Sequence, residues 1–199
     1  MKKVLFDFKV ADIVEIAILC SLAIVLDTFV KIPLGPSGSI NLSMVPILVI
    51  ALRHGWFKTL FAGGLVYGLI TCLLDGYGII TYPLDYFLGF GSTAVLGLFT
   101  EYINKNYKTN AKNTIICFVF LTVGILSWGT IRFFASSLSS VILYEYTWEA
   151  AFTYNLGYVY ISCIADLVVL IGLLPLITRL SKIYPTTFTK EINKSKIEE

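Results

Sequence analysis

Long apolar runs follow one another along this chain, separated by short polar connections. A helix of ~20 apolar residues is long enough to cross the hydrocarbon core of a bilayer. We expect about six such spans, at residues 11–30, 40–52, 57–74, 82–102, 114–137 and 152–180. Because 57% of the residues are hydrophobic and only 14% are charged, too few polar side chains remain to cover a soluble domain. The sequence therefore predicts an all-α integral membrane protein, a bundle of about six transmembrane helices.

Basic residues predict which end of this bundle faces the cytoplasm. If the spans alternate in direction, most of the basic residues fall at one end: Lys2, Lys3, Lys9, Arg53, Lys58, Lys105, Lys108, Lys112, Arg179, Lys182 and Lys190. Connections rich in Lys and Arg stay on the cytoplasmic side. We therefore expect cytoplasmic termini, a multi-pass protein of the cell membrane, one transmembrane domain over residues 1–183 and a polar cytoplasmic tail over residues 184–199. The net charge of +2 gives no reason to expect nucleic acid as a partner.

Prolines and glycines predict where the helices are interrupted or packed closely. Residues 31–39 hold two prolines and two glycines, so this stretch is expected to be a loop. Pro46 lies inside the short second span, where we expect it to bend or break the helix. Gly64 and Gly68 form a small-xxx-small pattern, which gives the third span a face for close packing.

One carboxylate stands among tyrosines at the end of the bundle opposite the basic residues. Asp85 is next to Tyr86 and near Tyr82, at the start of the fourth span. An ionisable side chain at membrane depth is costly and is a functional candidate by default. A carboxylate offsets the desolvation of a bound cation, and each tyrosine or tryptophan face adds cation–π attraction of ~0.5–2 kcal/mol. We interpret Asp85 as the polar anchor of a site for a small cationic or aromatic molecule.

Other aromatic and polar side chains are expected at the same end. The aromatic ones are Tyr77, Tyr144, Tyr146 and Trp148. Asn155, early in the last span, offers donors and acceptors to the edge of a heteroaromatic ring. Two alternatives stay open: the aromatic residues are also what an interfacial belt would contain, and Asp85 could be the structural partner of Arg132.

Four stretches of the sequence occur in the order and at roughly the spacing of a known family. They are GPSGSINLSMVPILVIALRHGW (35–56), DYFLGFGSTAVLGLF (85–99), IRFFASSLSSV (131–141) and TYNLGY (153–158). The chain resembles the thiamine-specific substrate-binding subunit, or S component, of energy-coupling factor transporters. The resemblance implies six helices around an outward-facing pocket that the loop after the first helix closes. It also implies tight vitamin binding without a cofactor or a metal, and transport only together with a transmembrane coupling subunit and two ATPase subunits.

The resemblance assigns roles to particular residues. The acidic-aromatic pair of the family matches Asp85 and Tyr86, and its asparagine matches Asn155, which follows Tyr154. Tyr82 is expected to line the same pocket. The small-xxx-small pattern with which such subunits dock the coupling subunit matches two positions in the first span: Ala17 and Ser21.

The sequence departs from the family at two pocket positions. Ser136 stands where the family has a histidine, and the stacking tryptophan of the family falls near Tyr144, although Trp148 could serve from a shifted position. Each change removes a polar contact or stacking area and is expected to cost ~1–3 kcal/mol with the same ligand. We therefore expect thiamine as the ligand, with a hydroxymethylpyrimidine-like precursor or another small vitamin as the alternative.

Two other classes of protein fit the sequence less well. A membrane enzyme needs a nucleophile, a metal cluster or paired carboxylates, and the spans offer only Asp85, Asp166 and isolated cysteines. We therefore expect no enzyme activity. A self-sufficient carrier typically has two related halves, and the halves of this sequence show no such repeat. The role of Asp166 stays open, with pairing to Arg132 or to a partner chain as the alternatives.

Overall fold

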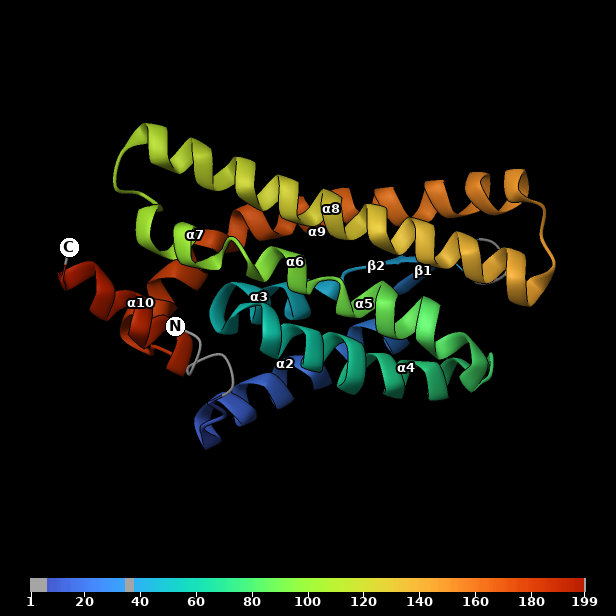
Figure 1. Ribbon diagram of the computed structural model, residues 1–199, viewed down its shortest axis with the longest axis horizontal. Coiled ribbons are helices and arrows are strands. Elements are labelled where there is room, and N and C mark those ends of the chain that lie inside the picture. The colour runs from blue at the N-terminus through green and yellow to red at the C-terminus, as the bar shows by residue number, and fades with distance from the viewer. Residues whose placement is uncertain (1–6, 35–37, 199) are drawn as a thin grey trace.

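Helices aligned with one long axis make up most of this protein (Figure 1). The computed structural model describes residues 7–34 and 38–198. The longer helices are α2 (Val10–Phe29), α3 (Met44–Thr59), α4 (Gly68–Asp75), α8 (Ala111–Tyr144), α9 (Trp148–Ile183) and α10 (Thr187–Glu198). Shorter pieces are η1 (Leu60–Tyr67), η2 (Ile79–Thr81), η3 (Tyr82–Leu88), α5 (Gly89–Gly91), α6 (Ala94–Gly97) and α7 (Thr100–Asn106). Within the described residues, three helical stretches are long and apolar enough to cross a membrane by length and composition alone: Met44–Asp75, Ala111–Tyr144 and Trp148–Ile183.

The first span is confirmed as α2, a helix of 20 residues. It differs from the three stretches above in carrying three acidic residues, Asp12, Glu15 and Asp27. One face of α2 packs into the bundle through residues such as Ile16 and Cys20, which are 8% and 2% exposed. The opposite face is exposed, so α2 lies at the edge of the bundle (Figure 1).

The second and third spans form a helical hairpin that turns at Gly55. This glycine has φ of +78°, a conformation that L side chains rarely adopt and that interrupts α3. Tyr67 donates a hydrogen bond to Ser43 at 3.0 Å, and a Cβ on Gly63 would lie 3.1 Å from Ile47. In each pair the two residues lie equally far from residue 55 in the sequence. The chain therefore doubles back at Gly55, and the two arms pack side by side.

The expected bend at Pro46 is wrong. Helix α3 begins at Met44, so Pro46 lies in its first turn. The N–H groups of a first turn have no partner within the helix, so proline costs no helical hydrogen bond there. The second span therefore starts later than predicted and runs unbroken to the turn at Gly55.

The fourth span is a chain of short helices rather than one helix over residues 82–102. It consists of η3, α5, α6 and α7. Its glycines allow close packing against the preceding hairpin: a Cβ on Gly97 would lie 2.4 Å from the backbone nitrogen of Trp56, and one on Gly91 3.2 Å from Gly64. The expected packing role of Gly64 and Gly68 is confirmed, since Gly68 lies equally close to the backbone of Tyr86.

Helices α8 and α9 form a long antiparallel pair. Thr130 and Tyr160 share a hydrogen bond of 3.1 Å, and Gly129 leaves room for the sulfur of Cys163. Thr147 caps the start of α9 by accepting a hydrogen bond from the backbone of Ala150 at 3.3 Å. The α8–α9 connection and the α4–η2 connection lie at the same end of the molecule, on the right in Figure 1, which we call the outer end.

The other end, which we call the base, gathers the start of α2, the turn at Gly55 and α10 (Figure 1). The polar tail predicted for residues 184–199 thus contains a helix. Phe188 of α10 is 6% exposed, and its ring would lie 3.0 Å from a Cβ on Gly55.

A second addition to the expected fold is a small hairpin where a loop was predicted: β1 (Lys31–Leu34) pairs antiparallel with β2 (Gly38–Asn41).

Candidate functional site

Asp85 lies at the outer end, where serines of α8 meet η3. It is half-buried in η3, a π-helical segment, and such wide turns are frequent at functional sites. Ser139 donates a hydrogen bond to Oδ2 of Asp85, and the side chain of Ser136 lies close by. One carboxylate oxygen thus has a fixed partner, while the residue stays partly open for another group.

Asn155 is brought to the same place from α9. Its Nδ2 donates to the backbone oxygen of Ala151 at 2.8 Å and to Oγ of Ser140 at 3.3 Å. Its Oδ1 accepts a hydrogen bond from Tyr158 at 2.8 Å. Because Ser139 and Ser140 are adjacent on α8, they connect Asp85 of η3 with Asn155 of α9. The cluster therefore combines three elements that are far apart in the sequence.

Tyrosines fix the position of η3 beside this cluster. Tyr86 is 6% exposed and donates a hydrogen bond to Oδ2 of Asp75 at 3.0 Å. Tyr82 donates to the backbone oxygen of Gly64 at 2.9 Å. Both hydroxyl groups thus have partners within the protein, which hold η3 in place.

The remaining predicted site residues lie at the rim of the cluster or outside it. Tyr154 packs against Tyr158 with ring centroids 5.5 Å apart. Tyr144 is 42% exposed and lies within electrostatic range of Asp85. Trp148 is 52% exposed and contacts Phe152 on the outer surface of α9, so the structure does not bring it to the carboxylate.

Arg132 is the basic residue nearest to this cluster. Its guanidinium carbon lies 4.9 Å from the ring centre of Phe90 and 5.9 Å from those of Trp128 and Tyr158. No ion pair within 4.0 Å joins it to Asp85 or Asp166, all three of which lie in the described part of the chain. The structure thus gives no support to the alternative that Asp85 is held in a salt bridge with Arg132.

Sequence analysis missed a second polar chain at the outer end. Asp27, at the end of α2, accepts a hydrogen bond of 2.6 Å from Asn41 of β2. Asn41 in turn accepts bonds from the backbone and the hydroxyl of Ser43, which is also bonded to the fully buried Tyr67. The only signal in the sequence was an acid at the end of an apolar run, which is uninformative without the contact to Asn41.

Acidic groups outnumber basic ones among the charged side chains of the outer end. Asp27, Asp75 and Asp85 come from α2, α4 and η3, while Arg132 is the basic side chain in contact with the cluster. A site with this charge balance favours a cation. Aromatic side chains and the second lone pair of Asn155 Oδ1 add means to hold a flat heteroaromatic ring.

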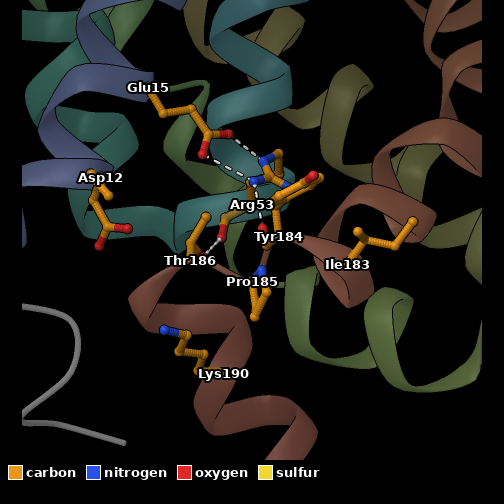
Figure 2. A pocket seen from close by; sticks show the side chains of 9 residues that line it. Asp12, Glu15, Arg53, Ile183, Tyr184, Pro185, Thr186 and Lys190 are labelled. Carbon is orange, nitrogen blue, oxygen red and sulfur yellow. Dashed lines mark hydrogen bonds and ion pairs between the residues drawn. The ribbon is translucent and has the colours of Figure 1, made fainter.

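A cavity of about 290 Å³ lies at the base, far from Asp85 (Figure 2). It is lined by Ala11, Asp12, Glu15, Arg53, Ile183, Tyr184, Pro185, Thr186 and Lys190. Figure 2 shows Arg53 bonded to both oxygens of Glu15 and to the backbone of Tyr184. Thr186 donates to the backbone oxygen of Arg53 at 2.7 Å. These bonds join α2, α3 and the connection to α10, so the polar groups here hold the base together.

Lys58 forms a buried ion pair beside this cavity. Its Nζ lies 2.7 Å from Oδ2 of Asp12, with the two side chains 0% and 4% exposed. Oδ1 of Asp12 accepts a hydrogen bond from the backbone of Thr187. Arg53 and Lys58 flank the turn at Gly55, and the structure buries both side chains in ion pairs.

Asp166 belongs to neither cluster. It is 0% exposed in the middle of α9, and neither carboxyl oxygen has a hydrogen-bond partner among residues 7–34 and 38–198. The expected alternative of pairing with Arg132 is not seen.

A family model described as thiamine transporter protein matches residues 13–184. The chain belongs to this family. The family consists of transporters, so the expectation that the chain is no enzyme is confirmed, as is the resemblance found in the sequence.

Two relatives of this thiamine transporter family member span nearly its whole length. It is 29% identical over 192 residues to the thiamine transporter ThiT of Bacillus subtilis (strain 168), covering 87% of this chain and 95% of that protein. A solved structure of ThiT from Listeria monocytogenes matches with a TM-score of 0.64 and 26% identity, over 89% of this chain and 97% of that one. The predicted all-α membrane bundle is therefore confirmed.

Proposed function

We propose that this chain binds thiamine at the outer end and serves as the S component of an energy-coupling factor importer. The observation that carries the proposal is the cluster of Asp85 and Tyr86 of η3 with Asn155 of α9, which Ser139 and Ser140 of α8 connect. Membership of the thiamine transporter family supports the ligand. The basic residues of the base support an orientation in which the base faces the cytoplasm and the site lies on the outer side of a cell membrane.

The chemistry of thiamine suits the groups at this site. Its thiazolium ring carries a permanent positive charge, for which Asp85 is the half-buried counter-charge. Its aminopyrimidine ring carries an amino donor, for which Oδ1 of Asn155 has a second lone pair beside the one that accepts from Tyr158. The faces of Tyr86 and Tyr154 are suited to stacking on flat rings.

Calorimetric titration of the purified, ligand-stripped chain in detergent tests this proposal. We expect saturable one-to-one binding of thiamine in the nanomolar range, the equivalent of about −12 kcal/mol. Riboflavin, which is uncharged, serves as the control and should give no heat of binding. A folded sample that does not bind thiamine would refute the proposed ligand.

A hydroxymethylpyrimidine-like precursor is the second candidate ligand. Two placements favour it: Ser136 offers less contact than a histidine would, and Trp148 lies on the outer surface of α9. The first removes a polar contact and the second removes stacking area. Titration with the precursor separates the candidates, because a precursor-specific site would bind it more tightly than thiamine.

The exposed face of α2 supports the proposed coupling to a transmembrane subunit. Ala17 and Ser21 are both exposed there. The hydroxyl of Ser21 donates a hydrogen bond to the backbone oxygen of Ala17 at 2.8 Å, so a docking helix need not supply an acceptor for it. Two small residues one turn apart let a second helix approach closely. We propose that this face docks the coupling subunit, which two ATPase subunits energise.

Enlarging the small residues of α2 is expected to abolish complex formation while leaving ligand binding intact. Ala17→Trp and Ser21→Trp would hold a partner helix away by the width of an indole ring. Co-purification with the coupling module measures docking, and titration with thiamine measures binding. Leu22→Trp is the matched control, because Leu22 is 46% exposed on a different side of α2. Normal assembly of the Ala17 and Ser21 variants would place the docking surface elsewhere.

A further inference from the structure

The cavity at the base lies between the start of α2 and the end of α9 (Figure 2). Apolar side chains on both helices are exposed beside it: Val10 and Val14 on α2, and Leu180 and Ile183 on α9. Ile183 also lines the cavity itself. Exposed apolar surface on a spanning helix meets the acyl chains of lipids. The cavity therefore has an apolar border along which an acyl chain can lie.

The charges of this cavity leave one cation in excess. Both oxygens of Glu15 accept hydrogen bonds from Arg53, and Asp12 is paired with the buried Lys58. Lys190 of α10 lines the cavity and is exposed, and it forms no ion pair with any residue in the described ranges 7–34 and 38–198. The two carboxylates are thus neutralised within the protein, while the charge of Lys190 is free to attract an anion.

Arg53 adds a fixed hydrogen-bond donor to the same cavity. Its side chain is 2% exposed, and it makes two bonds to Glu15. It also donates to the backbone oxygen of Tyr184 at 3.1 Å and to the hydroxyl of Ser181 at 3.5 Å. These bonds use four of the five N–H groups of a guanidinium, and the fifth has no partner in the described part of the chain. A held guanidinium beside an unpaired lysine is suited to a phosphate group.

We propose that this cavity binds the headgroup of an anionic phospholipid, with its phosphate between Lys190 and Arg53 and an acyl chain against Ile183. Basic pockets between transmembrane helices at the membrane surface are typical sites for such headgroups. Tyr184 is 71% exposed here, and exposed tyrosines are common at the level of the headgroups. A free phosphate would satisfy Lys190 but would leave the apolar border uncovered. This inference goes beyond the proposed function and does not depend on thiamine as the ligand.

Native mass spectrometry of the full chain in detergent tests this site with two lipids that have the same acyl chains. We expect phosphatidylglycerol, which is anionic, to bind in preference to phosphatidylcholine, which has no net charge. Lys190→Gln should weaken binding of phosphatidylglycerol at least about fivefold, the equivalent of ~1 kcal/mol for one basic residue at a membrane surface. Lys112→Gln is the matched control, because Lys112 is exposed at the start of α8 and does not line the cavity.

Inorganic phosphate distinguishes a lipid from a free anion. It should not raise the melting temperature of the chain at concentrations where phosphatidylglycerol does, and equal protection by phosphate would refute the lipid. Equal binding of the two lipids, or unchanged phosphatidylglycerol binding by Lys190→Gln, would also overturn the proposal. If Lys190→Gln lost only co-purification with the coupling module, the cavity would belong to a protein partner instead. Thiamine binding by this variant should match the parent, so either idea can fail without the other.

Discussion

Asp85→Asn is expected to weaken thiamine binding by roughly 10- to 150-fold, the equivalent of ~1.5–3 kcal/mol for a hydrogen-bonded charge. Asparagine has nearly the shape of aspartate and can still accept the hydrogen bond that Ser139 donates. The substitution therefore removes the negative charge and little else. Calorimetric titration of the variant beside the parent measures the loss.

Two comparisons make this result specific to the carboxylate of Asp85. Glu149→Gln removes a negative charge from an exposed position at the same end of the molecule and should leave affinity within about twofold, because solvent screens exposed charges. An analogue with an uncharged ring in place of the thiazolium should bind the parent and Asp85→Asn alike. Undiminished thiamine binding by Asp85→Asn would mean that the cation is held elsewhere.

The existence of the spans could be predicted from the sequence, but their ends could not. Hydropathy marks the residues that lie in hydrocarbon, whereas a helix ends where its backbone hydrogen bonds end. Helix α8 was expected to stop near residue 137 and runs to Tyr144. The extra turns carry Ser139 and Ser140, the two residues that connect Asp85 with Asn155. Sequence analysis therefore missed the side chains that assemble the site.

The interruptions of the helices depended on neighbours that the sequence does not show. Pro46 was expected to break a helix and instead lies in a first turn, while the actual reversal is at Gly55. A glycine in an apolar run can serve in close packing or in a turn. Only the packing of Phe188 and Trp56 around Gly55 and Gly97 distinguishes the two roles.

Some residues of the candidate site could be predicted from the sequence, and others could not. Asp85 stood out because a carboxylate inside an apolar run is costly to bury in a membrane and seldom occurs there without a function. Asp27 and Asp75 lie at the ends of helices, where acids are common, so their places beside Asn41 and Tyr86 required the tertiary structure. The unpaired state of Arg132 could not be predicted either, since the sequence offered both Asp85 and Asp166 as partners.

Removing Lys58 is expected to be among the most destabilising single changes at the base. Lys58→Met leaves the carboxylate of Asp12, 3% exposed, without its cation. Breaking a buried ion pair from one side costs about 3–5 kcal/mol, because an uncompensated charge stays in a poorly solvated place. The apparent melting temperature in detergent should fall accordingly. Thiamine affinity at a temperature where the variant is folded should be unchanged, since the pair lies at the opposite end from Asp85.

A second substitution distinguishes the unpaired charge from lost packing. Asp12→Leu combined with Lys58→Met replaces both charges by apolar side chains, which is often neutral for a buried pair. The double variant should therefore recover more than half of the stability lost by Lys58→Met. Lys105→Met is the control: Lys105 and Glu101 lie 3.5 Å apart with side chains 17% and 33% exposed, and a pair of this kind contributes only about 0.2–1 kcal/mol. If the double variant melts as low as Lys58→Met, the stem of Lys58 rather than its charge stabilises the base.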